Sequence, residues 1–368
     1  MRIREVYLHN FRCFRGRHRI SFVNPVTDTV YPVSVLAGAN GTGKTTILEV
    51  IDISLTILIS GVLDFLLALQ ISDDAYVHVI LELSPDEMFI EHQESDLRDK
   101  HQLIIAIGNQ NLAPDSIQFD QWPHRALFLH NDEEDVHIEK YSHSIIKWRE
   151  QVKEKNQTKQ IEGGYVYFPQ ERQLSNIISG AIEPPQIRTF WGVAVRIQQE
   201  WKNSLQQFWV WQNYLDLEAG NGSHSHFKSF VETVEDVLGP NRKISIKQGQ
   251  VTIPTPWYNT NGVQERIGLN QLPSGEKQCL LLFGELARHR RKHSVIMIDE
   301  VESSLHPTLQ RLVMHNLRKF AREWDAQIIV ATHSREVIQS VRGGAFILLD
   351  DIKEFDDTYP VESMESDA

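Results

Sequence analysis

Cysteine is scarce in this chain: Cys13 and Cys279 are the only two in 368 residues, and they lie far apart. Two distant thiols indicate neither a disulfide framework nor a zinc site, because both need several clustered ligands. Long apolar runs are also missing, since no stretch approaches the roughly 18 uninterrupted apolar residues of a membrane-spanning helix. The first residues lack the apolar segment of a secretory signal peptide. We therefore expect a cytoplasmic protein without membrane contact.

Basic residues are outnumbered, because 37 Lys and Arg face 49 Asp and Glu and give a net charge of −12. This balance argues against a uniformly basic nucleic-acid surface. Residues 350–368 contribute −7 of that charge, which predicts a solvated acidic tail, with partner docking or DNA mimicry as the alternatives. Basic clusters at 12–19, 147–155 and 288–292 are most simply solvated faces. They would follow DNA phosphates only if a dimer aligned them.

Residues 38–45, Gly-Ala-Asn-Gly-Thr-Gly-Lys-Thr, match the phosphate-binding loop pattern G-x-x-x-x-G-K-[ST]. Apolar residues before this P-loop predict a strand and those after it predict a helix, which is the context that the motif requires. Lys44 is expected to reach the β- and γ-phosphates, and the Thr45 hydroxyl to bind Mg²⁺. The backbone N–H groups of the loop and the helix N-terminus supply the remaining positive potential. The residues predicted to hold the nucleotide here are Gly38, Asn40, Gly41, Gly43, Lys44, Thr45 and Thr46.

Two adjacent carboxylates follow a second apolar run at residues 295–298. Asp299 is placed to hold Mg²⁺, directly or through water, and Glu300 to orient and polarise an attacking water. An Asp-Glu pair alone can equally end a strand and start a turn. Beside a P-loop, the pair favours hydrolysis of a nucleoside triphosphate over simple binding.

Residues 272–278, Leu-Pro-Ser-Gly-Glu-Lys-Gln, precede an apolar segment that predicts a helix. The simplest explanation is a serine N-cap with a capping-box-like start. However, the segment stands before the acidic strand and resembles the signature motif of the ABC-type ATPases. The resemblance implies that Ser274 and Gly275 bind the γ-phosphate held by the opposite subunit. ATP would then be sandwiched in a homodimer, or in a higher even-numbered oligomer.

Two more strand ends agree with this resemblance. Residues 328–332 predict a buried strand, and His333 after it looks like the family's switch histidine near the γ-phosphate. Taken alone, a histidine there would be an ordinary loop residue. Residues 165–168 predict another strand, and Gln170 falls where the family places its Q-loop glutamine, a contact for Mg²⁺ and water. Gln173 lies close by and leaves that assignment open.

Within the ABC class, the chain resembles the RecF, SMC, Rad50 and OLD group rather than the transporters. The opening Asn-Phe-Arg segment is similar to the group's first strand, which implies that Arg12 lies near the nucleotide. Residues 302–307, Glu-Ser-Ser-Leu-His-Pro, resemble its D-loop. The resemblance covers about 1–60, 164–173 and 268–348. It implies an α/β head with a mixed sheet and flanking helices, using ATP and Mg²⁺.

In SMC and Rad50 proteins a long coiled coil separates the Q-loop from the signature motif. About 60 residues are available for it here, and no heptad pattern persists, so a short helical lobe is expected instead. An apolar stripe supports a helix there, formed by Ile197, Trp201, Leu205 and Phe208, with Trp209 and Trp211 beside it. The expected divisions are an N-terminal half at 1–84, an insertion completing that lobe at 85–163, a Q-loop region at 164–180, the helical lobe at 181–240, a C-terminal half at 241–349 and the acidic tail at 350–368.

Three functions fit these motifs. The favoured one is an ATPase whose head-to-head dimer gates a separate effector, such as a nuclease, because stand-alone heads resemble the ATPase subunits of anti-phage systems such as Septu. No Toprim nuclease domain, which OLD proteins carry, is expected in this chain. The second is a RecF-like ATPase that binds DNA during repair. The third is a non-hydrolysing nucleotide sensor or scaffold, against which Lys44, Asp299, Glu300 and His333 weigh together.

Overall fold

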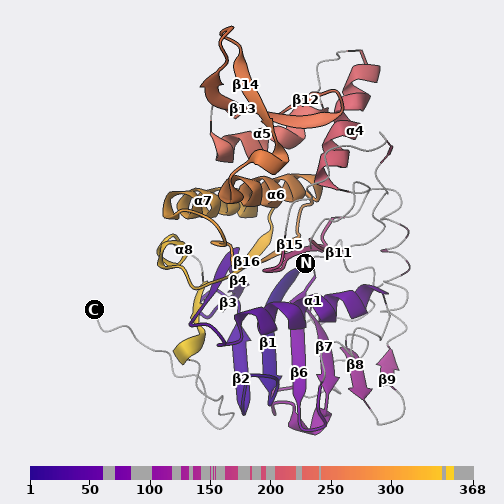
Figure 1. Cartoon of the computed structure of the whole chain (residues 1–368). Coiled ribbons are helices and arrows are strands. Elements are labelled where there is room, and N and C mark those ends of the chain that lie inside the picture. The colour runs from indigo at the N-terminus through magenta and orange to yellow at the C-terminus, as the bar shows by residue number, and fades with distance from the viewer. Residues whose placement is uncertain are drawn as a thin grey trace.

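Two large β-sheets lie on opposite sides of helix α1 (Lys44–Ser60), and helices α6 (Ser274–Arg288) and α7 (Pro307–Glu323) cover the far face of one of them (Figure 1). This computed structural model describes residues 1–60, 71–83, 102–117, 126–131, 136–141, 150, 152, 154, 162–172, 183–184, 192–195, 204–220, 226–239, 242–341 and 345–351. No helix in these ranges is both long and apolar enough to span a membrane.

One sheet is entirely parallel, in the order β11-β10-β15-β16-β5-β17. Its strands are β5 (Val33–Ala37), β10 (Tyr165–Phe168), β11 (Gly192–Ala194), β15 (Val295–Asp299), β16 (Gln327–Thr332) and β17 (Ala345–Leu348). Parallel sheets are covered on both faces, so their strands are apolar along their length. Alternate side chains point to opposite faces. Val295 and Met297 accordingly join the core around α1, whereas Ile296 and Ile298 join the core under α6 and α7.

The second sheet has the order β2-β1-β6-β7-β8-β9 and is antiparallel except between β7 and β8. Its strands are β1 (Arg2–His9), β2 (Arg17–Ser21), β6 (Tyr76–Glu82), β7 (Gln102–Gly108), β8 (Ala126–Asn131) and β9 (Val136–Tyr141). The last three come from the segment predicted to complete this lobe. Short pieces complete the region, namely β3 (Val23–Asn24), β4 (Thr29–Val30) and the 3-10 turn η1 (Gln110–Leu112). The mixed sheet and flanking helices match the α/β head that the sequence predicts.

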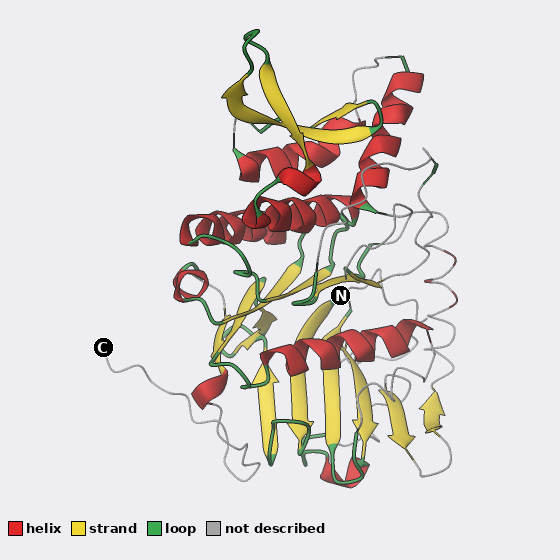
Figure 2. Cartoon of the chain, viewed as in Figure 1, coloured by secondary structure: helices red, strands yellow, loops and turns green. Residues whose placement is uncertain are grey.

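The remaining lobe combines helices with a small antiparallel sheet, β12-β13-β14 (Figure 2). Its elements are α4 (Leu205–Glu218), α5 (His226–Leu238), β12 (Ser245–Lys247), β13 (Gln250–Tyr258), β14 (Gln264–Gly268) and the turn η3 (Leu269–Gln271). Leu205, Phe208 and Trp209 of the predicted stripe are buried, while 197 and 201 fall outside the described residues. The sheet was not predicted, because β13 contains Pro254 and Pro256, which disfavour an interior strand.

A buried polar cluster lies in the antiparallel sheet. The His78 imidazole is fully buried; its Nδ1 lies 3.2 Å from the Tyr76 hydroxyl and its Nε2 3.4 Å from Glu5 Oε1. Burial lowers the pKa of His78, and the contact with Glu5 only partly opposes that shift. Burial also acts to raise the pKa of Glu5, but contacts with His78 and Arg19 outweigh it and hold that pKa below its usual value. Both groups are therefore poor proton acceptors in the folded state.

We expect the free energy of unfolding to fall as the pH drops below about 6.5, the ordinary pKa of histidine. Unfolded His78 takes up a proton there, while the folded imidazole stays neutral to lower pH, so added acid favours the unfolded chain. Urea unfolding between pH 7.5 and 5 measures this slope. His78→Gln should flatten it, whereas His315→Gln, at an exposed position of α7, should not. Equal slopes for His78→Gln and the native protein would contradict the assignment.

Candidate active site

The P-loop joins the end of β5 to the start of α1, as the motif requires. Lys44 is 7% exposed, and its Nζ donates hydrogen bonds to the carbonyl oxygens of Gly38 at 2.8 Å and Ala39 at 2.7 Å. The Thr42 hydroxyl also donates to the Ala39 carbonyl, at 2.9 Å. These bonds fold the loop around the ammonium group and place the cation at the loop. Such a cradle suits the phosphates of a nucleotide.

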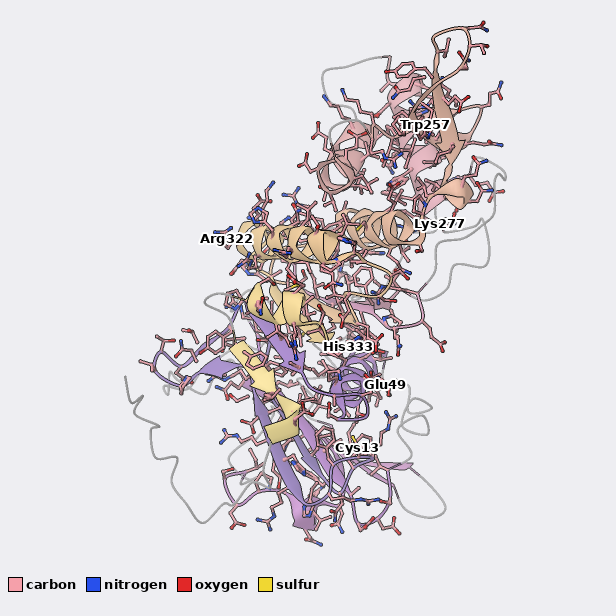
Figure 3. The ribbon with its side chains drawn as sticks, turned by 60° about the vertical axis from the view of Figure 1, so that its left-hand side comes forward. Cys13, Glu49, Trp257, Lys277, Arg322 and His333 are labelled. Carbon is pink, nitrogen blue, oxygen red and sulfur yellow. The ribbon has the colours of Figure 1, made fainter. Side chains whose placement is uncertain are left out.

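The opening segment of the chain packs against the P-loop. Gly43 has a φ of 95°, and a Cβ there would lie 2.4 Å from the Phe14 ring and 2.8 Å from Cys13 Sγ, so only glycine fits. Arg12, predicted to lie near the nucleotide, belongs to this segment and has a φ of 52°. Its guanidinium forms an ion pair with Glu49 of α1. In Figure 3, Glu49 lies between Cys13 below it and His333 above it.

Asp299 and Thr45 meet at the end of β15. The Thr45 hydroxyl donates to Asp299 Oδ2 at 2.8 Å. Asp299 is 1% exposed, and within the described residues its Oδ1 has no hydrogen-bond partner. Burial raises the pKa of this carboxyl, and the bond from Thr45 opposes the rise. A buried oxygen without a partner is costly, and carboxylate and hydroxyl oxygens are ligands that Mg²⁺ accepts. The pair therefore fits a Mg²⁺ site.

Glu300 and Gln170 are brought together by the register of two neighbouring strands. Phe168 of β10 pairs with Ile298 of β15, so the residues two positions later leave the sheet side by side. Gln170 Nε2 donates to Glu300 Oε2 at 3.0 Å. Glu300 has a φ of 46°, in the left-handed region that non-glycine residues rarely adopt. The structure thus places the predicted base and the predicted Q-loop glutamine in direct contact beside Asp299.

The loop with His333 follows β16, whose Ala331 pairs with Asp299. One carboxylate oxygen of Glu302, Oε1, accepts hydrogen bonds from the backbone N–H of His333 at 2.7 Å and of Ser334 at 3.1 Å. The same oxygen lies 3.1 Å from His333 Nδ1. Glu302 is buried and His333 is exposed. Glu302 belongs to the segment that resembles a D-loop, but no pattern in the sequence predicts that it holds the histidine loop.

A second residue missed by the sequence is Arg172, which is 3% exposed. Its guanidinium donates to the carbonyl oxygens of Asp299 at 2.6 Å, Pro169 at 2.9 Å and Glu300 at 3.0 Å. Burial lowers the pKa of Arg172, and the nearby Asp299, Glu302 and Glu300 carboxylates oppose that shift. A single arginine in a polar loop has no periodicity or spacing from which this role could be predicted.

Within the signature segment, Gln278 donates to the Arg172 carbonyl oxygen at 3.2 Å, but Ser274 contacts none of these groups among the described residues. Ser274 is exposed and is the first helical residue of α6, where Pro273 occupies the N-cap position. The serine N-cap explanation is therefore wrong, and within the described part of the chain the Ser274 hydroxyl makes no hydrogen bond. Gly275 packs closely, because a Cβ there would lie 2.8 Å from the Ser304 carbonyl oxygen. In Figure 3, Lys277 of the same helix lies above the part that carries Glu49 and His333.

Asp350 contacts the P-loop, although the sequence assigned it to a solvated tail. It lies in the turn η4 (Leu349–Asp351) after β17. Its carboxylate accepts hydrogen bonds from the Ala39 N–H at 3.0 and 3.2 Å. The reason is the parallel pairing of β17 with β5, which sets Leu348 beside Ala37. Residues 352–368 of the predicted tail fall outside the described residues.

The methionine import ATP-binding protein MetN of Corynebacterium jeikeium (strain K411) is 35% identical over 78 residues, 21% of this chain, and the match spans only 20% of MetN. Among solved structures, the SMC head domain from Thermotoga maritima is 14% identical with a TM-score of 0.44 and coverages of 93% and 92%. An SmcHead bound to the C-winged helix domain of ScpA is 11% identical with a TM-score of 0.48 and coverages of 94% and 96%.

The likeness to Septu ATPases stays a prediction. A family model described as "AAA ATPase domain" matches residues 1–338. That range includes the P-loop, the signature segment, the acidic pair at Asp299 and Glu300, and the loop with His333. The predicted ATPase head is thereby confirmed: this chain belongs to the AAA ATPase domain family.

Proposed function

We propose that the protein hydrolyses ATP to ADP and phosphate with Mg²⁺. The observation that carries this proposal is the hydrogen bond between Thr45 and Asp299 at 2.8 Å. Asp299 Oδ1, which has no partner among the described residues, and the Glu300 carboxylate lie next to it. A binding protein needs a cradle for phosphates, but it does not need a second carboxylate beside the metal position. Hydrolysis needs one, because the attacking water must be oriented and must lose a proton.

Each residue has a separate part in this reaction. Lys44 and the loop amides hold the β- and γ-phosphates, while Thr45 and Asp299 hold Mg²⁺. When bound, Mg²⁺ neutralises charge that develops on the phosphates. Glu300 accepts a proton from the attacking water, and Gln170, 3.0 Å from its carboxylate, orients that water. His333 approaches the γ-phosphate from the loop that Glu302 holds.

The reacting unit is a head-to-head homodimer. Ser274 supports this proposal, because its hydroxyl is exposed and unpaired among the described residues at the N-terminus of a 15-residue helix, where an anion is favoured. The γ-phosphate of ATP bound to a second protomer would supply the anion at the N-terminus of this helix. Opening and closing of the dimer would then carry the nucleotide state to other proteins.

The partner that we propose for the ATPase is the one predicted from the sequence. A separate effector, such as a nuclease in anti-phage defence, is the partner we propose. Turnover raised by duplex or gapped DNA would instead favour the RecF-like alternative. Co-purification of the tagged protein from its native host distinguishes the two, because it reports whether a nuclease or a nucleic acid accompanies the ATPase.

The test of the proposed reaction is phosphate release from ATP with Mg²⁺ and with excess EDTA. We expect turnover that requires Mg²⁺ in the native protein. Lys44→Ala should abolish ATP binding, because the cation facing the phosphates is lost. Lys319→Ala, at an exposed position of α7, removes a lysine elsewhere and should change neither ATP turnover nor ATP binding. Tight ATP binding by Lys44→Ala would mean that the site is misassigned. No turnover in the native protein, alone, with DNA or with a native partner, would favour the sensor.

A further inference from the structure

The Arg172 guanidinium bridges three backbone carbonyls at the centre of the candidate site. It binds Pro169 before the Q-loop glutamine, and Asp299 and Glu300 at the end of β15, at 2.6 to 3.0 Å. These bonds do not use the side-chain oxygens of the two acids. Arg172 therefore leaves both carboxylates available for Mg²⁺ and water, while it fixes the backbone that carries them.

The backbone that Arg172 holds is strained. Glu300 adopts a φ of 46°, a conformation that costs free energy in a non-glycine residue and persists only where several contacts enforce it. Its carbonyl oxygen accepts from Arg172 Nη2 at 3.0 Å and from the Ser303 N–H at 3.0 Å. Loss of the first bond would allow the peptide after Glu300 to rotate, and the carboxylate would move with it.

Arg172 is also tied to the signature helix. Gln278, four residues after Ser274 on α6, donates from Nε2 to the Arg172 carbonyl oxygen at 3.2 Å. The Arg172 N–H donates to the Gln170 carbonyl oxygen at 3.0 Å, and the Gln170 side chain donates to Glu300. Through Arg172, a continuous chain of hydrogen bonds therefore joins α6 to both acidic residues.

We infer that Arg172 is a positioning residue that fixes Asp299 and Glu300 and couples their placement to helix α6. This inference rests on the proposed ATPase reaction. It also gives a physical route by which an anion bound at the start of α6 affects hydrolysis: displacement of α6 moves Gln278, and the Arg172 backbone moves with it. A guanidinium is required, because its fixed fork of donors reaches several carbonyls at once, whereas a lysine ammonium is a compact point charge.

Arg172→Lys tests the inference by keeping the charge and losing the fork. We expect kcat to fall on the order of 10²-fold, the loss associated with a misplacement of about 1 Å. ATP affinity without Mg²⁺ should stay within about twofold, since Lys44 and the loop amides are untouched. The gain in ATP affinity on adding Mg²⁺ should be lost, because Asp299 is displaced. Arg288→Lys is the matched control, since that side chain is 5% exposed and lies at the other end of α6.

The outcomes are separable from those of the proposed function. Absence of turnover in the native protein would argue against hydrolysis. The gain in ATP affinity on adding Mg²⁺ would still test whether Arg172 positions Asp299. Unchanged kcat and unchanged Mg²⁺ gain in Arg172→Lys overturn the inference, as does an equal loss in Arg288→Lys. Should Arg172→Lys fail to fold, Gln278→Leu supplies the test by cutting one neutral hydrogen bond. A loss of about 2–10-fold in kcat is then expected, and no loss overturns the coupling to α6.

Discussion

Glu300→Gln is expected to lower ATP turnover by a factor on the order of 10²–10⁴ while leaving ATP binding intact, because a general base typically contributes that much to the rate. Glutamine has the shape of glutamate and can still accept the hydrogen bond that Gln170 donates at 3.0 Å. It cannot accept the proton of the attacking water. Binding should survive, because Lys44, Thr45 and Asp299, which we propose to hold the phosphates and Mg²⁺, are unchanged.

A closed dimer should accumulate in Glu300→Gln, since uncleaved ATP would stay between the protomers of the proposed dimer. Light scattering with Mg·ATP and with Mg·ADP measures this mass, alongside phosphate release. The native protein should show the dimer only transiently. Glu323→Gln, at an exposed position of α7, is the control for a surface glutamate and should behave as the native protein does. Unchanged turnover in Glu300→Gln would remove Glu300 from its proposed role.

The site residues at strand ends were predictable because parallel strands bring their C-terminal ends to one edge. Gln170, Asp299, Glu300 and His333 each follow an apolar run, and the runs become the adjacent strands β10, β15 and β16. A buried parallel strand leaves a strong sequence signal, an apolar run of four or five residues. That signal predicted the strand ends, whereas the selection of Gln170 and His333 came from the resemblance to the ABC-type ATPases.

The residues that hold this edge in place were not predictable. Arg172, Glu302 and Asp350 bond to partners far away in the chain, as with the contact between Asp350 and Ala39. Their geometry depends on the register of other strands, and no local spacing records it. Arg172 and Glu302 also bind backbone groups. Such contacts do not depend on which side chain the partner residue carries, so the sequence does not reveal them. Strand β13 was not predictable either, because Pro254 and Pro256 disfavour a strand in the interior of a sheet.

Ser274→Arg tests whether the signature helix serves the nucleotide of its own protomer or of the partner. An arginine at the first position of α6 would fill the space where an anion is expected, so the variant alone should be inactive. Lys44→Ala should also be inactive alone, for want of a P-loop cation. A mixed dimer differs from both, because one of its two sites combines the intact P-loop of one protomer with the intact Ser274 of the other.

Mixing the two inactive variants in equal amounts should therefore restore ATP turnover. Random pairing makes half of the dimers mixed, each with one working site of two, so recovery should reach about a quarter of the native value if the two sites of the symmetric dimer act independently. Phosphate release is measured after co-expression with two different affinity tags, which also proves that mixed dimers form. Mixed dimers as inactive as the separate variants would exclude the shared site, because a Ser274 that acts within its own protomer leaves both sites of the mixed dimer defective.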